Sequence, residues 1–127
     1  MPTTLAPSPK LTDTECAELY SRALAAGKAA ATATTPEPMV VQGHGIREVV
    51  ADGPCGFAWI KVRPANSRFA KWAVKKGIGR RSEYEGGVII WVHDYRQSMA
   101  LKEAHAYAVA RVLSEAGIHA YSQSRMD

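Results

Sequence analysis

Two kinds of side chain alternate along Phe57-Ala58-Trp59-Ile60-Lys61-Val62-Arg63. Small aliphatic residues occupy every second position, and aromatic or basic residues lie between them. Because successive side chains of a strand point to opposite sides of a sheet, this period of two predicts a β-strand with one aliphatic face and one aromatic, basic face. Pro64 should end the strand, since proline has no amide hydrogen to donate to a neighbouring strand.

A second strand is predicted over residues 88–93, Val-Ile-Ile-Trp-Val-His, because an apolar run of this length suits a central position in a sheet. Its alternate residues divide in the same way, with Trp91 and His93 on the face opposite the valines. The two strands together predict a sheet with an aliphatic face for helices and an opposite face that gathers Trp59, Trp91 and cations.

The N-terminal part of the chain predicts a tail, a helix and a linker. Residues 1–10 contain three prolines and are expected to be a disordered tail. Thr12 and Glu15 have the spacing of a capping box, which opens a helix running to about Ala31. Two short strands are expected further on, over residues 39–41 and 46–51.

The C-terminal part predicts two more helices and a last strand. A short helix is expected over residues 68–76, and a glycine-containing loop over residues 78–87 follows it. Asp94 and Gln97 repeat the capping-box spacing before a long helix that runs to about residue 116. The final strand is expected over residues 118–122.

These elements predict an α+β fold with a mixed sheet of three to five strands, two C-terminal helices on one face and an additional N-terminal helix. A chain of 127 residues suits one domain, here residues 11–127. Residues 11–34 supply the N-terminal helix and linker, and residues 53–127 form a β-α-β-α-β body. No apolar run is long enough to span a bilayer, and no secretory signal is present, so we expect a cytoplasmic protein whose two cysteines stay thiols.

Positive charge is concentrated in one segment. The chain has 16 basic and 12 acidic residues, a net charge of +4. Residues 61–81 hold eight of the basic residues and no acidic one, so the rest of the chain carries 8 minus 12, or −4. The eight are Lys61, Arg63, Arg68, Lys71, Lys75, Lys76, Arg80 and Arg81. Such a block is typical of a polyanion-binding surface, and the alternative is a solvated face that keeps the protein soluble.

The aromatic residues on the strands add a second indication of nucleic-acid binding. Aromatic rings interleaved with cations on a sheet face can stack on bases while the cations hold phosphates, which makes Trp59 and Trp91 candidate binding residues. Two alternatives remain open. The N-terminal helix could cover this face as a second core layer, or the face could form a homodimer.

A phosphate-binding loop is a further candidate. Glycines separate the cations along residues 75–81, Lys-Lys-Gly-Ile-Gly-Arg-Arg, and their amides could form an anion-binding nest. The Gly-Lys-Ser/Thr ending of a Walker loop is missing. A helix cap followed by an exposed basic loop explains the same residues.

No catalytic residue, metal site or cofactor is expected. The four histidines are far apart in the sequence, without the spacing of metal ligands. A nucleophilic pair of Cys55 and His44 is a weak alternative, because a cysteine at a strand start is more often a buried apolar residue. Residues 82–87 could line a small-molecule pocket, but the chemistry of a turn explains them as well.

The chain resembles small proteins encoded by tailed phages of actinobacteria, mycobacteriophages in particular. The matching segments are Cys55-Gly56-Phe57-Ala58-Trp59, Arg63-Pro64-Ala65-Asn66-Ser67, Tyr84-Glu85-Gly86-Gly87, Trp91-Val92, Gln97-Ser98, Lys102-Glu103-Ala104 and the ending Ala120-Tyr121-Ser122-Gln123-Ser124-Arg125-Met126-Asp127. The resemblance implies a phage protein made in the host cytoplasm that is not part of the virion, and it assigns no functional residue.

The sequence therefore favours a small non-enzymatic phage accessory protein that binds nucleic acid through residues 61–81. The alternative is a host-takeover protein that binds a host protein through its aromatic face or its N-terminal helix. A homodimer is compatible with either hypothesis, and neither involves a membrane.

Overall fold

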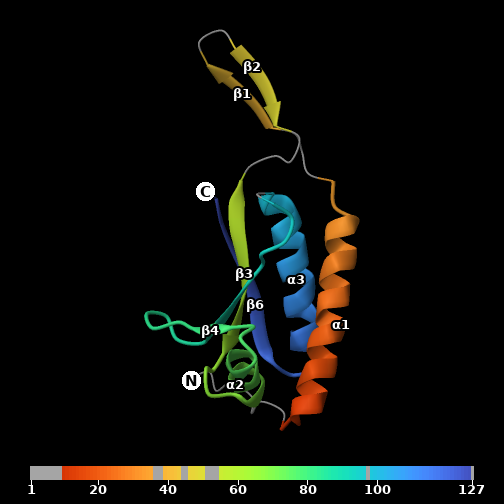
Figure 1. The fold of residues 1–127 in the computed structure, drawn as a ribbon, viewed down its shortest axis with the longest axis vertical. Coiled ribbons are helices and arrows are strands. Elements are labelled where there is room, and N and C mark those ends of the chain that lie inside the picture. The colour runs from red at the N-terminus through yellow and green to blue at the C-terminus, as the bar shows by residue number, and fades with distance from the viewer. Residues whose placement is uncertain (1–9, 36–38, 44–45, 51–54, 97, 127) are drawn as a thin grey trace, which may run out of the picture.

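The computed structural model describes residues 10–35, 39–43, 46–50, 55–96 and 98–126 (Figure 1). The elements, in chain order, are α1 (Asp13–Thr32), β1 (Met39–Gly43), β2 (Ile46–Val50), β3 (Gly56–Arg63), α2 (Arg68–Lys75), β4 (Arg80–Arg81), β5 (Val88–Trp91), α3 (Met99–Glu115) and β6 (His119–Met126). The predicted tail lies outside the described residues, except for Lys10. None of the described helices is both long and apolar enough to cross a membrane.

The larger sheet has four strands in the order β4-β5-β3-β6, while β1 pairs with β2 in a separate two-stranded sheet. The α+β class is confirmed, but the predicted mixed sheet is wrong, because every pair of neighbouring strands is antiparallel. After β3 the chain passes through α2 to β4 and leaves a gap of one strand. β5 then fills that gap, running opposite to both neighbours.

The predicted aliphatic face is confirmed as the core side of the sheet. Ala58, Ile60 and Val62 of β3 are buried, as are Val88 and Ile90 of β5. Figure 1 shows α3 against β3 and β6, with α1 alongside α3 on the same side of the sheet. Burying apolar surface contributes about 25 cal/mol per Å², so this face holds the helices in place.

The short helix α2 closes one end of this core. Phe69 and Trp72 are buried, and their ring centroids lie 6.4 and 6.0 Å from that of Tyr20 on α1. At the start of α2, Arg68 donates hydrogen bonds to the Leu11 carbonyl oxygen and to the Asp13 carboxylate of α1. α2 therefore lies beside α1 and β4, rather than next to α3 on the sheet.

The start of α1 follows the predicted capping box. The amide of Glu15 donates to the Thr12 hydroxyl at 3.1 Å, and the amide of Thr12 donates to the Glu15 carboxylate at 3.0 Å. The hydrogen bonds from the Thr12 backbone and side chain to the Glu15 carboxylate lower the pKa of Glu15, because they favour its ionised form. The capping box also satisfies two amides that have no partner within the helix, which fixes where α1 begins.

The start of α3 differs from the prediction. Tyr95 and Arg96 have φ angles of 72° and 53°, in the left-handed region, so a helix cannot continue through them from Asp94. The cap is instead Ser98, whose hydroxyl accepts a hydrogen bond from the amide of Leu101. Gln97, the second residue of the predicted capping box, lies outside the described residues.

α1 and α3 approach each other closely around a buried histidine. A Cβ atom added to Gly27 of α1 would lie 2.8 Å from ring atoms of His105 on α3. The Tyr95 hydroxyl lies 2.7 Å from Nδ1 of His105. Burial lowers the pKa of His105 below its ordinary value of 6.5, Lys28 acts in the same direction, and Asp94 opposes it.

The free energy of unfolding should consequently fall as the pH drops from above 6.5 towards the lowered pKa of His105. In that range the unfolded chain binds a proton that the folded chain excludes, so acidification favours unfolding. Urea unfolding between pH 8 and 5 measures this, with His105→Gln as the matched variant that lacks the titrating ring. An equally steep loss of stability in His105→Gln would show that other groups cause the pH dependence.

Candidate nucleic-acid interface

The aromatic face of the sheet is the side away from the core. Paired residues on neighbouring antiparallel strands place their side chains on the same face, so the register defines its rows. The central row is Trp91, Trp59 and Gln123, and the next row is Arg80, Ile89, Lys61 and Tyr121. Phe57 pairs with Arg125 on one side of these rows, and Arg63 pairs with His119 on the other.

Three aromatic rings form the centre of this face. The ring centroids of Trp59 and Trp91 lie 4.9 Å apart, and the Phe57 ring meets Trp91 edge-on at 6.4 Å. The Trp59 indole donates a hydrogen bond to the Gln123 side chain at 2.8 Å, which holds that ring in place. All three rings are only half-buried, so each presents apolar surface to solvent.

α1 does not cover this face, contrary to one of the two alternatives weighed for it. The buried positions of α1, among them Ala23, Gly27 and Ala31, pack along α3, and their small side chains allow the close approach of the two helices. Across the described ranges, the helices lie on the aliphatic side of the sheet (Figure 1). The homodimer alternative stays a prediction.

Lys61 does not extend into solvent, although it lies on the aromatic face. Its side chain is 1% exposed, and its ammonium donates to the Glu85 carboxylate at 3.1 Å. The Arg63 guanidinium donates to the carbonyl oxygen of Glu85 at 2.7 Å, so the loop over residues 82–87 lies against this end of β3. A buried cation that is paired with a carboxylate attracts a phosphate less strongly than an exposed cation does. Lys61 is therefore not included in the interface.

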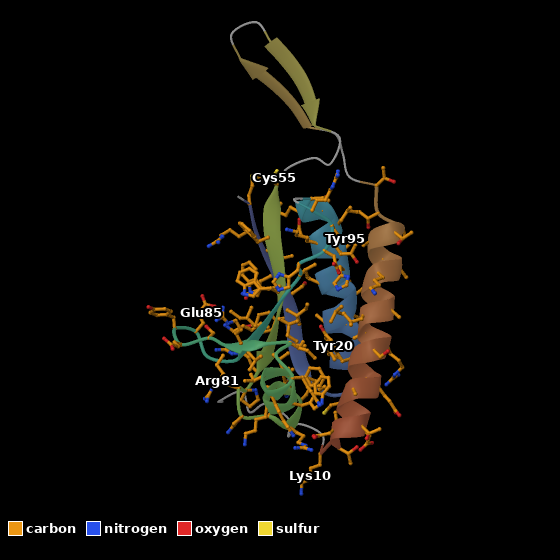
Figure 2. The ribbon with its side chains drawn as sticks, viewed as in Figure 1. Lys10, Tyr20, Cys55, Arg81, Glu85 and Tyr95 are labelled. Atoms are coloured by element: carbon orange, nitrogen blue, oxygen red, sulfur yellow. The ribbon has the colours of Figure 1, made fainter. Side chains whose placement is uncertain are left out.

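The remaining cations of residues 61–81 point to several different places. Arg68 and Lys75 both pair with Asp13 of α1, at 2.7 and 3.4 Å. Lys71 and Lys76 are exposed on α2 and just after it, and Arg80 and Arg81 are exposed on β4. Figure 2 shows Arg81 and Glu85 on the side of the molecule away from α1, while Tyr20 and Tyr95 lie among the helices. The eight cations thus do not form one continuous patch.

A groove lies where β3 ends and β6 begins. It has a volume of about 940 Å³, and it is lined by residues that include Arg63, Asn66, Arg81 and Tyr121. A smaller hollow of about 350 Å³ shares Asn66 and Arg81 with it and adds Lys71 and Lys75. The residues lining both hollows include no aspartate or glutamate, so this end of the sheet is positively charged.

The anion nest predicted over residues 75–81 is wrong, because the amides in question already have partners. The amide of Gly77 donates to the Val74 carbonyl, and the amides of Ile78 and Gly79 both donate to the Ala73 carbonyl. These hydrogen bonds satisfy carbonyls at the C-terminus of α2. The segment is therefore the helix cap and basic strand that formed the alternative interpretation.

Sequence reasoning missed the contribution of β6. The predicted strand stopped at residue 122, whereas the observed strand continues to Met126 and places Gln123 and Arg125 beside the aromatic rings. The guanidinium carbon of Arg125 lies 5.5 Å from the Phe57 ring centroid. The alternation of His119, Tyr121, Gln123 and Arg125 was the signal that could have revealed this strand.

The remaining candidates from the sequence are the cysteines, the histidines and residues 82–87. Both cysteines are free, and burial raises the pKa of the Cys16 thiol. His44, the proposed partner of Cys55, lies outside the described residues. Tyr84 is 99% exposed and is not among the residues that line the groove, whereas Gly86 and Gly87 line it. No group of three or more metal-ligating side chains occurs in the part of the chain that the structure covers.

Compared with family models, curated proteins and solved structures, the chain matches none of them.

Proposed function

We propose that this chain is a small non-enzymatic protein that binds single-stranded nucleic acid on the aromatic face. The observation that carries the proposal is the Trp59–Trp91 pair, half-buried on the two central strands, with arginines on the rows around it. Aromatic rings on a sheet give bases a stacking surface, and stacking contributes about 1–3 kcal/mol per base.

A single strand fits this surface better than a duplex does. In a duplex the flat faces of the bases are stacked on each other, so the half-buried indole rings gain no base to contact. An unpaired strand can turn its bases onto Trp59 and Trp91 and leave its phosphates at the margin of the face.

Three arginines lie where such phosphates would run. Arg63, Arg80 and Arg125 occupy rows of the aromatic face, whereas Arg81 pairs with the buried Val88 and lines the groove. Arg80 and Arg81 make no salt bridge with a carboxylate in the described ranges. Their charge is therefore available to a polyanion.

Fluorescence anisotropy with a labelled 5′-hydroxyl oligonucleotide and its duplex tests the proposal. The single strand should bind more tightly, with a log–log salt slope of roughly −2.1 if all three arginines contact phosphates, at about −0.7 per contact. Equal or tighter binding of the duplex would overturn the single-strand proposal. Absence of any binding at about 50 mM salt, where such attraction is strong, would overturn nucleic-acid binding altogether.

A protein partner on the same face is the alternative outcome. Affinity purification from host cells, with and without nuclease, separates the two: a partner lost on nuclease treatment supports nucleic acid, and a protein that survives it contradicts the proposal. The origin in a phage and the location in the host cytoplasm, which the resemblance implies, stay predictions.

A further inference from the structure

The groove beside the aromatic face has the features of a separate binding site. Its wall is built from three parts of the chain that are far apart in the sequence: residues 63–66 at the end of β3 and just after it, β4 with the following loop, and the end of α3 with the start of β6. Its volume of about 940 Å³ lies within the range of small-molecule sites, roughly 300–1,000 Å³, and far exceeds what one phosphate needs.

Two guanidinium groups give the groove its charge. Arg63 is held in place by the hydrogen bond from Nη2 to the Glu85 carbonyl, which uses one of its five N–H donors. Arg81 is exposed, and no salt bridge joins it to a carboxylate in the described part of the chain. Planar guanidinium forks match the geometry of phosphate oxygens, and no lining carboxylate repels an anion.

Tyr121 and Asn66 add the features that a group attached to the phosphate would contact. Tyr121 lines the groove, and 40% of its surface is exposed, so the ring offers a flat apolar surface in the same groove as the two arginines. Asn66, in the turn after β3, also lines the groove, and its side-chain amide can donate and accept hydrogen bonds.

The loop over residues 82–87 lies tightly against β3 at the edge of this site. Gly87 has a φ of +76°, and a Cβ atom there would lie 2.8 Å from the Val62 carbonyl oxygen and 3.1 Å from the Arg63 side chain. Only glycine lets the loop lie this close to β3 without displacing Arg63. The backbone thus supports the position of one of the two cations.

We propose that this groove binds a phosphomonoester, with the phosphate between Arg63 and Arg81 and a nucleobase on Tyr121. The phosphomonoester has two possible sources: a free nucleotide, or the phosphorylated end of a strand. Arg63 and Tyr121 belong to both the groove and the aromatic face, so a strand lying on Trp59 and Trp91 can reach the groove with its end. The strand-end source rests on the proposed function, and the free nucleotide does not.

Calorimetric titration of the full chain with adenosine 5′-monophosphate and with adenosine tests the site. The monophosphate should bind at least about tenfold more tightly, the effect of roughly 1.5 kcal/mol from hydrogen bonds to a charged group. Arg81→Gln should remove that advantage, and Arg22→Gln, at an exposed arginine of α1 that lines neither hollow, should keep it. Equal affinity for the two ligands, or the same loss in both variants, would overturn the inference.

Inorganic phosphate gives a second measurement that needs no variant. It should displace the monophosphate from the unaltered protein, because it carries the same charged group, and failure to displace it would contradict a phosphate site. Thermal melting of both variants checks their folding, which substitution of an exposed side chain should leave intact.

Two oligonucleotides of one sequence, with and without a 5′-phosphate, identify the source. Tighter binding of the phosphorylated strand than of the 5′-hydroxyl strand indicates that the groove takes the strand end. Equal binding of the two strands, together with binding of adenosine 5′-monophosphate, indicates that the groove takes a free nucleotide. The 5′-hydroxyl strand reports on the proposed function alone. If the 5′-hydroxyl strand binds and the monophosphate does not, only the inference about the groove fails. If the monophosphate binds and the 5′-hydroxyl strand does not, only the proposed function fails.

Discussion

Replacing Trp59 and Trp91 together with leucine is expected to weaken binding of a single-stranded oligonucleotide by about 30-fold or more. Each ring that stacks on a base contributes roughly 1–3 kcal/mol, so two rings contribute at least about 2 kcal/mol. Leucine keeps an apolar side chain on each strand while removing the flat ring. Anisotropy titrations of the variant and the unaltered protein, at the same salt concentration, measure the effect.

Tyr107→Leu is the matched control for this experiment. Tyr107 is an exposed aromatic residue, 63% exposed, but it lies on α3 and not on the aromatic face. Its replacement should leave the affinity unchanged. An unchanged affinity in the double variant, or an equal loss in Tyr107→Leu, would show that the two tryptophans do not contact the strand.

Phe69→Ala is expected to lower the free energy of unfolding by about 3–5 kcal/mol, as removal of a buried aromatic ring commonly does. Phe69 is 1% exposed, and its ring packs between Tyr20 of α1 and Trp72 of its own helix. The substitution leaves a cavity where α2 joins α1, so both helices lose contacts. Urea unfolding monitored by circular dichroism measures the change.

Val74→Ala on the same helix provides the comparison. Val74 is 37% exposed, so its truncation removes less buried surface and should cost well under half as much. Equal destabilisation by the two variants would contradict the position of α2 against α1.

Local patterns predicted the parts of the fold that depend on neighbouring residues in the sequence. The alternation along residues 57–63 indicated β3 and its two faces, because a strand enforces a period of two. Thr12 and Glu15 indicated the start of α1, because both partners of the capping box lie within four residues. The aromatic face, the most important part of the interface, followed from the same alternation.

Contacts between distant segments could not be predicted in this way. The apolar stripe of α1 showed that one side is buried, but not that it packs on α3 instead of on Trp59 and Trp91. Lys61 looked like a surface cation, but its side chain is buried and its ammonium pairs with Glu85, from a loop 24 residues later. The groove joins β3, β4 and β6, so its position depends on the strand order, which no local pattern determines.

The most direct test of the central claim follows the indole N–H signals of the three tryptophans by NMR during titration with a 5′-hydroxyl single strand. Trp72 is an internal control, because its ring is 5% exposed and its indole nitrogen is buried in the core. The account predicts that the signals of Trp59 and Trp91 shift progressively with added strand while that of Trp72 stays in place. Binding of the strand without a shift of Trp59 and Trp91 would contradict the aromatic face as the site.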